Sequence, residues 1–297
     1  MLYLFLLILL VGVLFTNPIN GARSWYKIGD FLSFQPSELG KIFFIMFLSL
    51  VLYRLQLKGK KEINKPWKLL AFFAVAAIPI LLIAIQPDYG TAFAYIFALL
   101  FMLFVSGLDK KYIIVALLII LIGAPYVYEN VLPAHAKTRI EIFLDPESDP
   151  RGAGYNLIQS KLAIGAGQFF GMGLLKGNQT QLGYLYPKDT DFIFAVISEE
   201  MGFIVSMMVI ILNVILVTKA LHVAKTAKDN EGAYIAAGIA GIWLFHMTEN
   251  IGMTMGLLPI TGVPLSFVSY GGSSLLMNCI CIGILTNISG QRYRSMF

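Results

Sequence analysis

Charged residues are scarce in this chain. Of its 297 residues only 13% are charged, whereas 58% are hydrophobic, and the mean hydropathy is +0.76. A soluble domain is close to half apolar and a quarter charged. The apolar runs are long enough to cross a bilayer as helices, so the composition excludes a soluble globular protein and indicates an integral membrane protein.

Cysteines and cofactor motifs are also scarce. The two cysteines, Cys279 and Cys281, lie two apart in an apolar run. On a helix they point to different faces, which favours buried apolar side chains over a disulfide or a metal pair. The sequence has no Walker loop, no dinucleotide fingerprint and no His/Cys metal spacing. The net charge of +5 comes mostly from short loops between apolar runs and needs no nucleic acid to explain it.

Apolar runs predict an all-α fold, a polytopic membrane helix bundle with about eight transmembrane helices. The candidate spans cover residues 1–16, 41–56, 69–87, 90–107, 112–131, 191–218, 232–255 and 267–288. Basic residues gather in every second connection, at 54–68, 108–111 and 219–231, and in the tail with Arg292 and Arg294. These segments should share one side of the membrane, so we expect both termini to be cytoplasmic.

The long connection 132–190 then lies on the outer face. A connection of this length in a tight bundle is usually functional or disordered. It contains aromatic and apolar residues and several glycines. We therefore expect re-entrant or interfacial pieces, among them a short amphipathic helix within 155–170.

Several ionisable residues near the spans are functional candidates by default. Asp191 stands where the long connection enters an apolar run. Glu38 and Lys41 share a helix face, either as a structural ion pair or as a cationic seat for an anionic head group. Asp88 lies in a turn between two spans, where capping the next helix is the alternative to a functional role.

The outer face carries further polar features. Arg139, Arg151 and Lys161 could bind phosphate or pair with the acidic run 145–149. The segment 256–274 is broken by Gly and Pro, which indicates either a re-entrant turn bordering a site or a tight outer loop. The residues thus indicate a polar site for an anionic lipid-linked or amphipathic substrate, but do not separate an enzyme from a transporter.

Six segments resemble one family closely. They are NGARSWYKIG at 20–29, FQPSELGK at 34–41, QPDYGTA at 86–92, LDPESDPRGAGYNLIQSKLAIGAG at 144–167, TDFIFAVISEE at 190–200 and NIGMTMGLLPITGVPLSFVSYGGSS at 250–274. Together they resemble the SEDS family of shape, elongation, division and sporulation proteins (RodA, FtsW, SpoVE). The motifs are most similar to those of RodA. The resemblance implies a single SEDS-type transmembrane domain over 1–297. Family members usually have ten spans, so the first two are expected to be absent from this chain.

The resemblance implies a peptidoglycan glycosyltransferase. Such an enzyme polymerises lipid II, an undecaprenyl-diphosphate-linked precursor, into glycan strands on the outer face of the bacterial cytoplasmic membrane, for cell elongation and shape. The implied partners are a class B penicillin-binding protein and the lipid bilayer, and no nucleic acid. The alternatives are a lipid-linked precursor transporter and a non-catalytic scaffold for the penicillin-binding protein.

The family's essential Asp falls on Asp191, which would be the catalytic base. Transfer from a diphosphate needs such a base and also cations for the leaving group. The candidate substrate-binding residues are Lys41, Glu38, Arg139, Lys161, Asp88 and Ser273. A divalent cation, Mg or Mn, is the expected cofactor, with Asp191 or Asp189 as its candidate ligand. Many members have His where this chain has Asp189, and a second carboxylate there would raise the pKa of Asp191 or help hold the metal.

Overall fold

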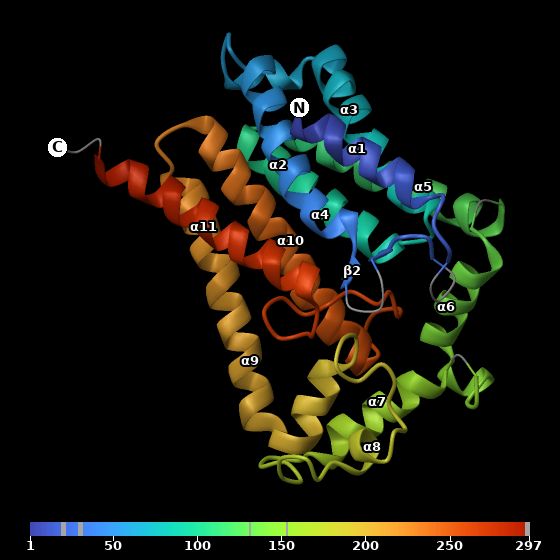
Figure 1. Ribbon diagram of the computed structural model, residues 1–297. Helices are drawn as coiled ribbons and strands as arrows, with labels where there is room; N and C mark the ends of the chain where they lie inside the picture. Colours follow the sequence, from blue (N-terminus) through green and yellow to red (C-terminus); the bar gives the residue numbers. More distant parts are fainter. Residues whose placement is uncertain (19–21, 29–31, 131, 153, 295–297) are drawn as a thin grey trace. The chain divides into compact units, whose positions relative to one another are not determined.

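The computed structural model of the chain describes residues 1–18, 22–28, 32–130, 132–152 and 154–294 (Figure 1). Asn20, Gly21 and Gly29 of the first family-like segment lie outside the described residues, as do the side chains of Arg292 and Arg294. The chain forms two compact units. The first unit comprises Met1–Leu108, Asn213–His246 and Tyr270–Phe297, and the second comprises Asp109–Leu212 and Met247–Ser269.

The first unit is helical apart from one small hairpin. Its helices are α1 (Leu2–Val13), α2 (Pro36–Leu55), α3 (Pro66–Ile85), α4 (Tyr89–Ser106) and α11 (Gly272–Arg294), with the 3-10 helix η1 (Lys60–Asn64) and parts of α9 (Ile193–Thr226) and α10 (Asn230–Met255). The strands β1 (Tyr26–Ile28) and β2 (Leu32–Phe34) pair antiparallel before α2, with Tyr26 opposite Phe34. This hairpin is a small addition to the predicted all-α fold.

The second unit contains the long connection. It holds α5 (Lys110–Asn130), α6 (Ala134–Leu144), η2 (Pro146–Ser148), α7 (Tyr155–Ala166), α8 (Asn178–Gln181), the first part of α9 and the end of α10. The helix predicted within 155–170 is confirmed as α7, which ends at Ala166.

Helix α2 is the centre of the first unit and contacts α1, α3, α4 and α11. Pro36 occupies its first turn, where the missing N–H costs nothing. Apolar side chains such as Phe44 and Leu48 are fully buried. Gly40 allows close packing, because a Cβ there would overlap Leu6 and the Tyr95 hydroxyl.

Every predicted span is occupied by a helix, which confirms the all-α membrane fold. Among the described helices, α3, α4, α5, α9 and α11 are long and apolar enough to cross a membrane. The N-terminus and the basic α2–α3 and α9–α10 connections lie toward the same end of the first unit (Figure 1). That placement is compatible with the predicted topology, although the cytoplasmic location of the termini stays a prediction.

The prediction of one continuous span over residues 191–218 is wrong. Helix α9 breaks at Gly202, whose φ of 76° and ψ of −173° are not helical. A side chain there would meet the backbone at Phe169 and Gly171, so the close approach and the positive φ both require glycine. The spanning piece of α9 therefore begins at Phe203, and a separate short helix carries residues 193–201.

Candidate active site

The backbone around Asp191 is held in place within the second unit. Nδ2 of Asn250, on α10, donates to the carbonyl oxygens of Asp191 at 2.9 Å and Val263 at 2.8 Å. Oγ of Ser269 donates to the Thr190 carbonyl oxygen at 2.7 Å. Asn250 is fully buried, so this clamp fixes the start of α9 against the loop 256–269.

The Asp191 side chain lies against Gly262. A Cβ on Gly262, whose φ is +74°, would be 3.2 Å from Asp191 Oδ2. Burial raises the pKa of the Asp191 carboxyl, while a hydrogen bond with Thr190 and the charge of Arg139 lower it less. A carboxylate with a raised pKa accepts a proton more readily than an exposed one, which suits a general base.

Arg139 borders a small cavity near this carboxyl group. The cavity has a volume of about 160 Å³ and is lined by Arg139, Ile142, Phe143, Asn156, Leu157 and Ile260. Its wall thus combines one cation and one amide with apolar side chains. Because the charge of Arg139 acts on Asp191, an anionic group bound here would lie within electrostatic reach of both.

Lys161 has a structural contact of its own. Its exposed side chain passes over Gly256, which has a φ of +73° and follows the last residue of α10. The neighbouring Ser160 Oγ donates to the Thr254 carbonyl oxygen at 2.8 Å, which fixes α7 to α10. A cation is favourable at a helix C-terminus, so this contact explains the position of Lys161 without a substrate. The substrate role of Lys161 stays a prediction.

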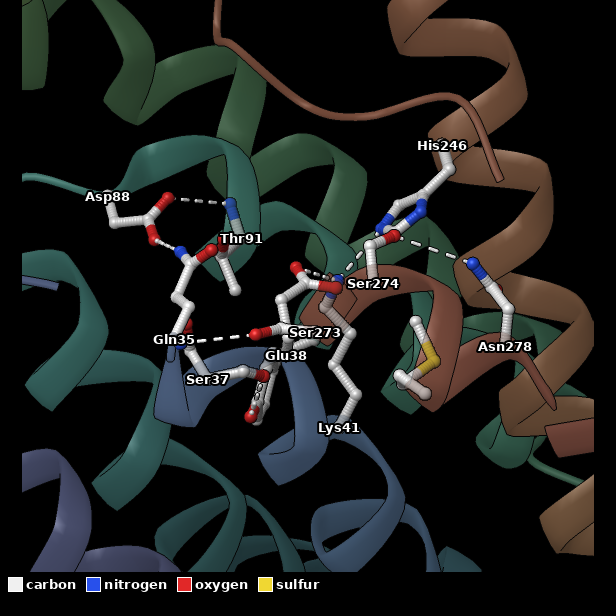
Figure 2. A network of polar contacts seen from close by, with 12 residues as sticks. Gln35, Ser37, Glu38, Lys41, Asp88, Thr91, His246, Ser273, Ser274 and Asn278 are labelled. Carbon is white, nitrogen blue, oxygen red and sulfur yellow. Dashed lines mark hydrogen bonds and ion pairs between the residues drawn. The ribbon is translucent and has the colours of Figure 1, made fainter. Parts of the chain in front are cut away.

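Glu38 and Lys41 form a buried ion pair in the first unit (Figure 2). The Lys41 Nζ lies 2.6 Å from Glu38 Oε1 and 3.0 Å from His246 Nε2. Lys41 is 1% exposed, Glu38 3% and His246 0%. An ammonium group only donates, so His246 Nε2 accepts from Lys41 and is unprotonated. His246 is therefore a hydrogen-bonded buried histidine.

Asp88 and Ser273 belong to the same polar network (Figure 2). Gln35 Nε2 donates to Asp88 Oδ2 at 2.8 Å, and its backbone N–H donates to Ser273 Oγ at 3.5 Å. Asp88 Oδ1 also accepts from the Thr91 N–H at 3.1 Å, so its capping of α4 is confirmed. Burial raises the pKa of Asp88, and the bonds from Thr91 lower it less.

The predicted site residues fall into two sets, one in each unit. The first unit holds Glu38, Lys41, Asp88 and Ser273, and the second holds Asp191, Arg139 and Lys161. Sequence reasoning missed the positioning roles of Asn250, Gly262 and Ser269. Their only signal is that they lie within the segment 250–274, because residue spacing does not reveal which backbone groups a side chain holds.

The predicted divalent cation stays a prediction, because an ion of this kind is usually held by one or two carboxylates together with substrate phosphates. In the described part of the chain, no group of three or more His, Cys, Asp or Glu side chains is placed to hold one. Asp189, the expected second ligand beside Asp191, is exposed. No step proposed below therefore passes through a metal.

The fold and this site define an integral, multi-pass membrane protein with a partly buried carboxylate as its candidate acid–base centre. The chain belongs to the FtsW/RodA/SpoVE family of cell cycle proteins, which matches residues 1–294.

Relatives within this family share most of the chain. It is 38% identical to the peptidoglycan glycosyltransferase MrdB of Escherichia coli K12, over 98% of this chain and 77% of the relative. It is 32% identical to the peptidoglycan glycosyltransferase RodA of Treponema pallidum, over 97% of this chain and 82% of that one. It is 36% identical to stage V sporulation protein E of Bacillus subtilis, over 97% and 76%.

Solved structures agree with this assignment. A chain from work described as structural coordination of polymerization and crosslinking by a peptidoglycan synthase complex superposes with a TM-score of 0.83 and 29% identity, covering 98% of this chain and 80% of that one. The rod shape determining protein RodA of Thermus thermophilus gives a TM-score of 0.68 and 27% identity, covering 98% and 77%.

Proposed function

We propose that this chain is a peptidoglycan glycosyltransferase that polymerises lipid II into glycan strands, with Asp191 as its general base. The observation that carries the proposal is the carboxyl group of Asp191, whose pKa is raised by burial and on which the charge of Arg139 acts, on a residue whose backbone carbonyl oxygen is held by Asn250. The names of the relatives described above support the reaction class.

The reaction can be written with Asp191 and Arg139 alone. The oxygen of an acceptor sugar hydroxyl attacks the anomeric carbon of the donor while Asp191 takes the hydroxyl proton. The bond between that carbon and the diphosphate breaks, and the diphosphate leaves with the prenyl carrier. Arg139 is the candidate for stabilising the charge of the leaving diphosphate.

The proposed setting is the outer face of the bacterial cytoplasmic membrane, with both termini cytoplasmic. A class B penicillin-binding protein is the proposed partner, since a strand polymerase requires an enzyme that crosslinks its product. The structural relative described in terms of polymerization and crosslinking supports this partner. Lys161 remains a predicted contact to the substrate, whereas the burial of Lys41 against Glu38 favours a structural ion pair.

The test compares Asp191→Asn with wild type and with Asp189→Asn, an exposed neighbour that serves as a matched control. Purified protein with its transpeptidase partner receives labelled lipid II, and glycan strands are resolved by gel electrophoresis. Losing a general base typically costs about 10²–10⁴-fold in rate, so we expect that loss only for Asp191→Asn. Polymerisation by Asp191→Asn at the wild-type rate would show that the base assignment is wrong.

The same preparation separates the alternatives. Labelled lipid II that crosses liposome membranes without forming polymer would indicate a transporter. If the chain were only a scaffold, cells with Asp191→Asn would keep their shape. They would lose it only with changes on the surface that faces the partner.

A further inference from the structure

The length of the membrane-spanning piece of α9 determines how deep its first residue lies in the membrane. At about 1.5 Å per residue, the piece from Phe203 to Thr226 is about 35 Å long, slightly more than a hydrocarbon core of roughly 30 Å. Lys219 and Lys225 lie near its C-terminal end and belong at one membrane boundary. Phe203 therefore lies at the opposite boundary.

The segment 168–175, which we call the glycine-rich loop, is fixed to that end of α9. The Phe203 N–H donates to the Gln168 carbonyl oxygen at 2.8 Å. The rings of Phe169 and Phe203 meet edge to face with centroids 5.9 Å apart. Because these contacts are direct, the glycine-rich loop shares the membrane depth of Phe203.

Apart from Gln168, the side chains of the glycine-rich loop are apolar, and its largest ones are exposed. Phe170 is 82% exposed, Leu174 68% and Leu175 70%. The stretch from Gly165 to Leu175 contains no charged residue, and Lys176 follows directly. Such a surface is costly in water, but it suits acyl chains with the lysine at the head groups.

Four backbone N–H groups of the glycine-rich loop donate hydrogen bonds within the protein. The N–H groups of Gly171, Met172, Gly173 and Leu175 donate to Gly167 O, Glu199 O, Glu200 O and Glu200 Oε2 at 2.7–3.0 Å. Both glutamates are buried, and Glu199 also accepts the N–H groups of Gln179 and Thr180 at 2.7 and 3.0 Å. Irregular backbone is tolerated at membrane depth when its polar groups are satisfied in this way.

We propose that the glycine-rich loop inserts into the bilayer as a lipid anchor, at the membrane boundary opposite the α9 lysines. The occupant of its apolar surface is lipid because that surface continues into the exposed apolar face of α9. That face includes Phe203, Ile204, Met208 and Ile211, which lie on a membrane-spanning helix. Part of the long connection is thus a membrane element, independent of the role of Asp191.

The test places a tryptophan on the glycine-rich loop. Phe170→Trp and the control Ser148→Trp, at an exposed polar position in η2, are purified and reconstituted in nanodiscs without partner proteins. Wild-type emission is subtracted. Quenching is then compared between lipids brominated in their acyl chains and iodide in the buffer.

We expect Phe170→Trp to be quenched more strongly by brominated lipid than by iodide, and Ser148→Trp to show the reverse order. Stronger quenching of Phe170→Trp by iodide would place the glycine-rich loop in water and overturn the proposal. Protection from both quenchers would mean that protein covers the loop, which also overturns it. Leu174→Trp repeats the measurement if Phe170→Trp fails to fold.

Discussion

Asn250→Asp tests how strongly the backbone clamp at Asp191 supports catalysis. In the wild type both Nδ2 protons are used, one for the Asp191 carbonyl oxygen and one for that of Val263. A carboxylate has nearly the same volume, so no cavity forms. It has no donor, however, and its charge repels both carbonyl oxygens.

The size of the effect follows from these two contacts. A buried acceptor left without its donor costs about 1–3 kcal/mol, so the two carbonyl groups together cost about 2–6 kcal/mol. The segment relieves this cost by moving, which displaces Asp191. A displacement of about 1 Å can lower a rate about 100-fold. We expect a loss of that size in kcat with little change in KM, because Asn250 is fully buried and contacts no substrate.

The assay measures strand formation against lipid II concentration, with folding checked by thermal melting. The matched control is Asn278→Asp, a buried asparagine of the first unit whose Oδ1 accepts from Trp243 Nε1 at 2.7 Å, a role that Asp keeps. A folded Asn250→Asp protein with wild-type kcat would refute the reasoning, as would an equal loss in Asn278→Asp. If Asn250→Asp does not fold, Ser269→Ala removes the hydrogen bond to the Thr190 carbonyl oxygen and the one accepted from the Leu265 N–H, and it should give a smaller loss in kcat.

Two further predictions concern the same carboxyl group. The charge of Arg139 lowers the pKa of Asp191, so Arg139→Gln should raise that pKa and move the acidic limb of the kcat/KM profile to higher pH; an unmoved limb would contradict the assigned coupling. Gly262→Ala puts a Cβ 3.2 Å from Asp191 Oδ2, whereas Gly183→Ala strains a similar φ of +77° in open space. Both should melt at lower temperature than wild type, and only Gly262→Ala should lose strand formation.

Hydropathy predicts the spans because bilayer insertion depends on the composition of each segment, which the sequence displays directly. The break in α9 has a different origin. Gly202 adopts a non-helical φ because the backbone of residues 169–171 packs against it, and that contact comes from a remote segment. An isolated glycine in an apolar run is compatible with a helix, so the sequence alone favours the continuous span.

The site residues show the same difference between properties of one segment and contacts from remote segments. Asp191 stands out in the sequence because a carboxylate at a membrane edge is costly. Glu199 and Glu200 follow in the same apolar run, and both are buried. Their partners are N–H groups of residues 175, 179 and 180 in the long connection, which no helical periodicity relates to α9. The sequence shows the two carboxylates, but it does not show which loop N–H groups donate hydrogen bonds to them.

The buried Glu38–Lys41 pair gives a last prediction that separates structure from substrate binding. Lys41→Met alone leaves Glu38 buried without its cation, which typically costs about 3–5 kcal/mol. The double variant Glu38→Gln/Lys41→Met removes both charges, and replacing a whole buried pair is often nearly neutral. Because Lys41 is covered and already paired at 2.6 Å, we expect the double variant to regain both thermal stability and strand formation. Recovery of stability without activity would instead support the sequence-based role of Lys41 as a cation for the diphosphate, because the fold would then be intact although the Lys41 contact to His246 is lost.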